Sequence, residues 1–394
     1  MTATGTSTAP DVVDVVALGE SMVAFLPSRP GRLADVPSFD RGIGGAESNV
    51  ACVLAAAGHP TRWVSRVGED GFGDHLVEAI GAYGVDVTAV PRDPARPTGV
   101  YFRTAGDRAT DAHEVAYYRA GSAASAMAVE NVDLRAVRAG RVLHLSGITA
   151  ALSDECSGLL WWLTAPRPER PLVSFDVNFR PGLWRDAEGP RVLLDLARRA
   201  DVVFVGTDEA RAAWGVTGGP EAIRALLPEP PVLVVKEGAR GATVFERADE
   251  HVDRPSRPAA GAAEAARVGA GGTPQEPGRA TDPRPARTPG ADEKPPAFVP
   301  APHVTVAAAV GAGDAFAAGF LSATLRGLPV RDRLRHGHLW AAAALTVPGD
   351  LATPPPRDHA DRLAALDDGA WGRLRLGPGW THAVDRASEE VRTP

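Results

Sequence analysis

Residues 310–320 read Val-Gly-Ala-Gly-Asp-Ala-Phe-Ala-Ala-Gly-Phe, a glycine-rich turn that runs directly into a helix-forming segment. Asp314 falls in the first turn of the expected helix. Backbone N–H groups at a helix N-terminus lack partners and carry the positive end of the helix dipole, so they favour an anion. A carboxylate here would repel a phosphate, but it could remove a proton from a hydroxyl group beside one. The stretch therefore indicates phosphoryl transfer to a hydroxyl group.

Two better-known phosphate motifs do not fit this stretch. The third glycine is wrongly placed for a dinucleotide-binding fingerprint, and the motif lies late in the chain. No Gly-Lys-Ser/Thr follows, as a P-loop would require. What remains is an anion hole made by the N–H groups of Gly311, Ala312 and Gly313, with Asp314 as the candidate base.

Strand and helix patterns alternate through the middle of the chain. Nearly continuous apolar segments, typical of strands buried on both faces, occupy residues 14–20, 142–145, 172–176, 202–205 and 232–236. Helical patterns lie between them, so we expect βαβ units and an α/β fold with a mostly parallel sheet. Residues 99–103 and 114–119 alternate polar and apolar side chains instead, which predicts a small antiparallel sheet apart from the main one.

Composition and charge argue against several kinds of binding partner. The formal net charge of −7 and the absence of a sustained basic run argue against nucleic acid. Cys52 and Cys156 make neither a disulfide framework nor a metal site, and no signal peptide or apolar run of about 18 residues occurs. We expect a cytoplasmic protein without a membrane partner.

Two segments are expected to lie outside the folded core. Residues 1–10 are small and polar and are expected to form a disordered tail. Residues 249–300 are dominated by Pro, Ala, Gly, Arg and Glu, with no Leu or Ile. Such a stretch buries too little apolar area to offset its ordering entropy, so we expect a disordered surface insertion.

A second motif lies near the start of the chain. Residues 44–51 read Gly-Gly-Ala-Glu-Ser-Asn-Val-Ala, about 265 residues before the Gly-Ala-Gly-Asp stretch. In this order the two motifs resemble the signatures of the ribokinase-like (PfkB) carbohydrate kinases. The resemblance implies one kinase domain over residues 11–394, with a mostly parallel central sheet flanked by helices. It also implies a small β-sheet lid with strands within residues 20–42 and 96–120, and dimerisation through that lid.

Within this family the chain is most similar to the 2-keto-3-deoxygluconate kinases. The segments that carry the similarity are residues 44–47, 96–102, 117–123, 144–148 and 176–184. The resemblance implies ATP and Mg²⁺ as cofactors and phosphorylation of the C6 hydroxyl of a six-carbon sugar acid. A kinase of a neutral sugar such as fructose, a nucleoside kinase, and a degenerate sugar-binding protein remain as alternatives.

Candidate sugar-binding residues come from four segments. Arg180 follows a predicted buried strand and could bind the substrate carboxylate in a bidentate manner, with Arg119 as a second contact. Tyr101 and Tyr118 offer flat apolar faces that suit a sugar ring. The first motif adds three further candidates, namely Gly44, Gly45 and Asn49, with Asp314 at the reacting hydroxyl. A surface ion pair for Arg180 and sheet packing for Tyr118 are the simpler interpretations.

The nucleotide side rests on the resemblance. It implies that Asn178, Lys236, Gly238 and Gly241 lie near ATP, together with residues 311–313. Glu209 matches a family glutamate that binds magnesium through water, although Gly206 stands where the family has Asn. An ordinary hairpin turn at residues 236–241 and a surface role for Glu209 remain open.

A further departure lies just before the anion hole. Residues 308–310 are Ala-Ala-Val, where the family usually has Asp-Thr-Thr. The missing carboxylate and hydroxyls are groups that could hold a monovalent cation, so activation by potassium is left open.

Overall fold

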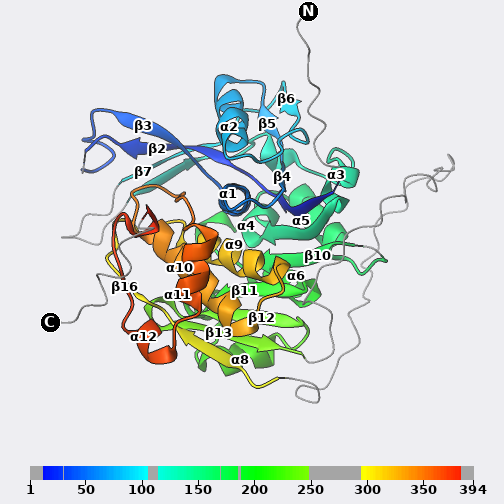
Figure 1. Ribbon diagram of the computed structural model, residues 1–394. Helices are drawn as coiled ribbons and strands as arrows, with labels where there is room; N and C mark the ends of the chain where they lie inside the picture. Colours follow the sequence, from blue (N-terminus) through cyan, green and yellow to red (C-terminus); the bar gives the residue numbers. More distant parts are fainter. Residues whose placement is uncertain are drawn as a thin grey trace, which may run out of the picture.

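The computed structural model describes residues 12–29, 31–104, 114–168, 170–184, 188–247 and 294–382. An eight-stranded sheet runs through its centre in the order β14-β13-β12-β11-β10-β9-β1-β4 (Figure 1). The strands from β4 to β12 pair in parallel, whereas β13 and β14 are antiparallel. The predicted α/β fold with a mostly parallel sheet is therefore confirmed. In sheet order the strands are Ala297–Pro300 (β14), Gly241–Glu246 (β13), Val232–Lys236 (β12), Val202–Gly206 (β11), Leu172–Asp176 (β10), Gly140–Ser146 (β9), Val13–Leu18 (β1) and Thr61–Val64 (β4).

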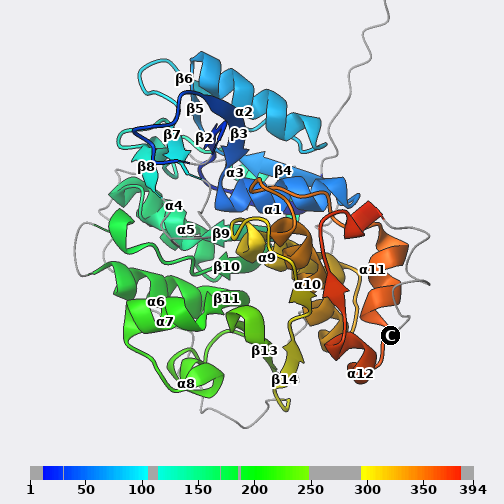
Figure 2. The same cartoon turned by 90° about the vertical axis from the view of Figure 1, so that its left-hand side faces the viewer.

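Helices cover both faces of this sheet (Figure 2). Alternate strand residues point to opposite faces, so Val16 and Leu143 pack in one apolar core while Val15 and Val142 pack in the other. The first core is closed by α4 (Gly147–Ala150), α5 (Asp154–Thr164), α6 (Gly189–Arg199), α7 (Thr207–Trp214) and α8 (Gly219–Leu226). The second is closed by α1 (Ala46–Ala56), α9 (Ala312–Leu325), α10 (Val330–Leu345) and α11 (Arg357–Ala364).

A four-stranded sheet stands beyond one edge of the main sheet, in the order β3-β2-β7-β8 (Figure 1). It consists of β2 (Met22–Pro27), β3 (Phe39–Gly44), β7 (Val100–Arg103) and β8 (Val115–Tyr118). The small separate sheet is confirmed, and β3 runs two residues past the segment expected to end at residue 42. Stacking of Phe25 on Phe102, with ring centroids 4.6 Å apart, holds β2 to β7.

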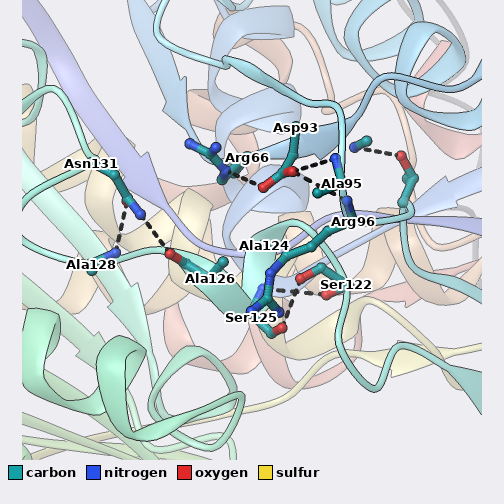
Figure 3. A network of polar contacts seen from close by, with 12 residues as sticks. Arg66, Asp93, Ala95, Arg96, Ser122, Ala124, Ser125, Ala126, Ala128 and Asn131 are labelled. Carbon is teal, nitrogen blue, oxygen red and sulfur yellow. Dashed lines mark hydrogen bonds and ion pairs between the residues drawn. The ribbon is translucent and has the colours of Figure 1, made fainter.

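Polar contacts fix the segments that lead into and out of this small sheet (Figure 3). Asp93 accepts a 2.8 Å hydrogen bond from Arg66 Nε and two more from the amides of Ala95 and Arg96, just before β7. After β8, Ser125 Oγ donates a 2.7 Å bond to the carbonyl of Ser122. The segments before β7 and after β8 are thus each held by hydrogen bonds of their own.

The expected disordered insertion does not extend to residue 300. Ala297–Pro300 forms β14, the edge strand paired antiparallel with β13, so that part of the prediction is wrong. Val299 is 3% exposed and packs in the core, which explains the order of a segment so rich in proline. Residues 248–293 and the expected tail at residues 1–10 lie outside the described residues. Within the ranges that are described, no helix is long and apolar enough to cross a membrane.

Candidate active site

The glycine-rich turn begins α9, with Gly311 as its N-cap. Gly311 has φ 69°, in the left-handed region that favours glycine. A Cβ on Gly311 would also collide with the backbone carbonyl of Asp350. No side chain of the described residues caps α9, so the amides of its first turn remain available to an anion, as the sequence predicts.

Asp314 lies in the first turn of α9 and faces α1. Its Oδ2 accepts a 2.8 Å hydrogen bond from Nδ2 of Asn49, which is 4% exposed. Burial raises the pKa of Asp314 to about 8, although the hydrogen bond from Asn49 acts against this rise. Asp176 raises the pKa further, whereas Lys236 and Arg180 lower it. A carboxylate with a pKa near neutral is suited to accept a proton.

Lys236 brings a positive charge to the anion hole. Its Nζ lies 2.9 Å from Oδ2 of Asp176, and a Cβ placed on Gly313 would lie 3.6 Å from the same nitrogen. Burial alone would lower the pKa of Lys236, but Asp176 and Glu209 outweigh it and raise that pKa, so the ammonium stays charged. Asp176 is 2% exposed, and its part in the site was missed. A carboxylate at the end of a predicted buried strand was the available signal.

Arg180 and Glu209 face each other at the edge of this group. Nη1 of Arg180 lies 3.6 Å from Oε1 of Glu209, and the arginine side chain is 53% exposed. The other carboxylate oxygen of Glu209 accepts a 2.7 Å hydrogen bond from the amide of Gly206 and so caps its own helix. Burial raises the pKa of Glu209, with Lys236 opposing it. Glu209 therefore has a local structural role as well as one oxygen directed to Arg180.

Asp350, which the sequence reasoning missed, joins the small sheet to the anion hole. Its Oδ2 accepts a 2.9 Å hydrogen bond from Tyr101 Oη, and its Oδ1 lies 2.7 Å from Nη2 of Arg103. Gly44 lies against the same group, since a Cβ there would collide with Tyr101 Oη. Burial and Asp350 raise the pKa of Tyr101, so its hydroxyl remains a donor. No motif surrounds Asp350, and only long-range packing shows its place.

The prediction that Tyr118 covers the sugar together with Tyr101 is wrong. Tyr101 pairs with Tyr117 across β7 and β8, and these two rings lie on one face with centroids 5.7 Å apart. Tyr118 is the next residue, so it points to the other face, where it meets Phe102 and is 66% exposed. Tyr117, rather than Tyr118, shares the face of Tyr101.

Arg119 is paired with a buried carboxylate. Its guanidinium forms an ion pair with Glu20, whose side chain is 1% exposed. Glu20 also accepts a 2.5 Å hydrogen bond from Ser122 Oγ. Nε of Arg119 is buried without a hydrogen-bond partner in the described part of the chain. Gly45 packs so closely on the backbone of Glu20 and Ser21 that a side chain would collide there, so packing alone explains this glycine.

The remaining nucleotide-side candidates lie at strand ends on the Lys236 side. Asn178 follows β10 and has φ 41°, a strained value for a residue other than glycine, and its Oδ1 is buried without a partner among the described residues. Gly238 and Gly241 have φ 59° and 143° and form the turn between β12 and β13. Gly241 also packs against the carbonyl of Val299. Sheet pairing thus accounts for this turn without a ligand.

These groups fit a nucleotide phosphate and its magnesium ion. The α9 N-terminus and Lys236 provide donors and positive charge for an anion, and Asn178 Oδ1 is an unused acceptor. The nearby carboxylates are Glu209 and Asp176, and Glu209 has one oxygen that takes no part in capping its helix. No cluster of three or more acidic, His or Cys ligands occurs in the described ranges.

Comparison with known proteins agrees with this geometry. The 2-dehydro-3-deoxygluconokinase of Thermoproteus tenax is 30% identical over 366 residues, spanning 92% of this chain and 98% of that protein. The fructokinase of Escherichia coli is 32% identical over 240 residues, spanning 60% and 75%. The crystal structure of a PfkB protein from Polaromonas sp. JS666 covers 89% of this chain and 99% of its own, with 31% identity and a TM-score of 0.68.

The family profile covers most of both halves of the chain. Residues 13–262 and 292–357 match the profile described as pfkB family carbohydrate kinase. The two matched segments contain both sequence motifs and every residue grouped above around Asp314. The chain therefore belongs to the pfkB family of carbohydrate kinases.

Proposed function

We propose that this kinase transfers the γ-phosphoryl group of ATP to the C6 hydroxyl of 2-keto-3-deoxygluconate. An acidic substrate is favoured by the ion pairing of the basic residues near the site, because all but one are held closely by a carboxylate. Lys236 is tied to Asp176 at 2.9 Å, Arg103 to Asp350 at 2.7 Å, and Arg119 to Glu20. Arg180 is half exposed and 3.6 Å from its partner, so it keeps a guanidinium free for a substrate carboxylate.

The relatives point the same way without deciding the substrate. The Thermoproteus tenax protein, which matches nearly the whole chain, is named for 2-dehydro-3-deoxygluconate, whereas the shorter match is to a fructokinase. A fructokinase activity is the second candidate, because Asp350, Tyr101 and Asn49 are hydrogen-bonding groups that a neutral ketohexose could also use.

In the proposed reaction Asp314 accepts the proton of the attacking C6 hydroxyl. The N–H groups of Gly311, Ala312 and Gly313 stabilise the charge that grows on the transferring phosphoryl group, and Lys236 adds a fixed positive charge beside them. Asn49 orients the Asp314 carboxylate through its 2.8 Å hydrogen bond. Magnesium, when bound, neutralises phosphate charge, and Glu209 would hold it through water.

We further propose that the small sheet closes over the sugar with the Tyr101 and Tyr117 face and excludes water. The opposite face exposes Tyr118 at 66%, which a second subunit could cover. The expected homodimer through the lid rests on this exposed ring and on the resemblance. Residues 308–310 are Ala-Ala-Val, so they offer only backbone carbonyls as ligands for potassium.

The test is ADP release with a panel of 2-keto-3-deoxy acids, fructose and nucleosides. Turnover with kcat/KM at least tenfold higher for the keto-deoxy acid supports the proposal. In an Arg180→Gln variant, KM should rise by about tenfold or more for the acid and change little for fructose, since a lost charged hydrogen bond costs about 1.5–3 kcal/mol. Equal effects on both sugars, or preference for fructose, would favour the fructokinase candidate.

A further inference from the structure

A buried ion pair joins two strand ends beside the anion hole. Asp176 is the last residue of β10 and Lys236 is the last residue of β12, and β11 lies between these two strands. Nζ of Lys236 lies 2.9 Å from Oδ2 and 3.2 Å from Oδ1 of Asp176. The contact therefore spans the end of β11 and fixes the position of the ammonium from the side of β10.

Both charges of this pair are largely removed from water. The side chain of Asp176 is 3% exposed and that of Lys236 is 18% exposed. Burial of two charges is costly, and apolar side chains of similar volume often serve a fold equally well in place of such a pair. Stability is thus a weak reason for a charged pair at this place, which favours a role in the reaction.

The ammonium keeps a donor that the pair does not use. A lysine ammonium has three N–H donors and no acceptor. Within the described residues, both hydrogen bonds of Lys236 go to the one carboxylate of Asp176. At least one N–H is therefore left for a further acceptor.

This ammonium lies at the open start of α9. A Cβ placed on Gly313 would lie 3.6 Å from Nζ of Lys236. Apart from the adjoining residues and the backbone of α9, no other atom of the described chain lies within 4 Å of that point. The first-turn amides and the ammonium thus border the same open space, and both are donors that suit a phosphoryl oxygen.

The pair also acts on the proposed base. Burial is the main cause of the raised pKa of Asp314, and Asp176 adds to this rise, whereas Lys236 and Arg180 oppose it. Against the effect of burial, Asp176 and Glu209 raise the pKa of Lys236 and keep its ammonium charged. The two members of the pair therefore act on Asp314 with opposite sign.

We propose that Asp176 is a positioning residue for phosphoryl transfer. It holds the Lys236 ammonium at the N-terminus of α9, where the remaining N–H of Nζ is donated to an oxygen of the transferring phosphoryl group. Neither residue gives up or takes up a proton in this step, which stays with Asp314. The kinetic consequence rests on the proposed kinase reaction, whereas the arrangement of charges around Asp314 does not depend on it.

Carbon-13 NMR of the full chain with labelled aspartate tests this arrangement without any activity. Loss of one signal in Asp314→Asn assigns the Asp314 carboxyl, whose pKa is then followed by titration. We expect this pKa to be lower than in wild type in Asp176→Asn, which removes a like charge, and higher in Lys236→Met, which removes an opposite one. A shift in the same direction in both variants, or in neither, would overturn the arrangement.

Asp201→Asn is the matched control for this titration. Asp201 also pairs with a cation, binding Arg170 at 2.6 and 2.8 Å, but it precedes β11 and lies at the opposite end of the strands from Asp176. Its loss should leave the pKa of Asp314 unchanged. A shift as large as that in Asp176→Asn would show that the titration reports general loosening of the fold.

Single-turnover transfer from ATP to the best sugar of the panel tests the positioning role. Asp176→Asn and Lys236→Met should each lower the saturated rate by about tenfold or more, with the half-saturating ATP concentration changed only a few-fold. The double variant should lose little more than Lys236→Met alone, because both changes remove the same contact. Losses that multiply, or an unchanged rate in Asp176→Asn, would overturn the role of Asp176.

Asp176→Glu covers the case in which Asp176→Asn does not fold. It keeps the charge but moves the carboxylate by one methylene, so a positioning role predicts a lower rate at an unchanged Tm. A wild-type rate in Asp176→Glu would contradict that role. A wild type without turnover on any sugar would instead contradict the proposed function, and the NMR titration would still decide the arrangement of charges.

Discussion

Asn49 and Asp314 form a 2.8 Å hydrogen bond that joins α1 to α9 across 265 residues of sequence. Each residue belongs to one of the two motifs, so this contact is where the motifs meet. The bond stabilises the ionised form of Asp314, whose pKa burial raises to about 8. It therefore limits how far burial raises the pKa of the proposed base.

Replacing Asn49 by Ala should move the acid limb of the pH profile of kcat/KM to higher pH. In the wild type this limb should lie near pH 8, because kcat/KM reports the free enzyme and Asp314 must be ionised. Without the amide donor the pKa of Asp314 rises further. Ser48→Ala is the control, since Ser48 Oγ bonds Ser21 and the Gly45 carbonyl rather than Asp314. An unmoved limb in Asn49→Ala would mean that another group titrates.

Asp314→Asn should become more stable relative to wild type as the pH rises. The folded state raises the pKa of Asp314 from 3.8 to about 8, so it prefers the protonated acid. That preference contributes fully below about pH 4 and is lost as pH rises through 8, where a buried charge must form. The difference in Tm between Asp314→Asn and wild type should therefore grow from pH 6 to pH 9. A constant difference would show that the carboxyl is not perturbed.

Tyr117 and Tyr118 offer a matched pair for the lid. Tyr117→Ala should raise the sugar KM several-fold, because its ring lies beside Tyr101 and within 5.8 Å of the Arg119 guanidinium. Tyr118→Ala removes the same group from the other face and should leave KM unchanged. Steady-state kinetics with the sugar varied measures both, and the reverse ranking would contradict the assigned face.

Arg103 and Asp350 should act as one unit in a double-mutant cycle. Their side chains are 10% and 16% exposed, so removing one partner leaves a largely buried charge. We expect Arg103→Met and Asp350→Asn each to lower kcat/KM by tenfold or more. The double variant should lose much less than the product of the two losses. Fully multiplicative losses would show that the pair does not couple the small sheet to Gly311.

Local patterns predicted the parts of this molecule whose side chains are fixed by their own strand or helix. The continuous apolar strands, the α9 turn and the place of Asp314 follow from short-range periodicity and turn chemistry. Tyr117 and Tyr118 are adjacent in one strand, so choosing between them needs the register against β7. Asp350 and β14 depend on packing between distant segments, which local composition does not report.

The most direct test of the account is single-turnover phosphoryl transfer by Asp314→Asn with saturating ATP and 2-keto-3-deoxygluconate. Asn keeps the size of the side chain but cannot accept the proton. The account predicts a rate lower by about 10²–10⁴-fold, with sugar affinity within a few-fold of wild type. A variant that keeps more than about a tenth of the wild-type rate would contradict the role of Asp314 as the base.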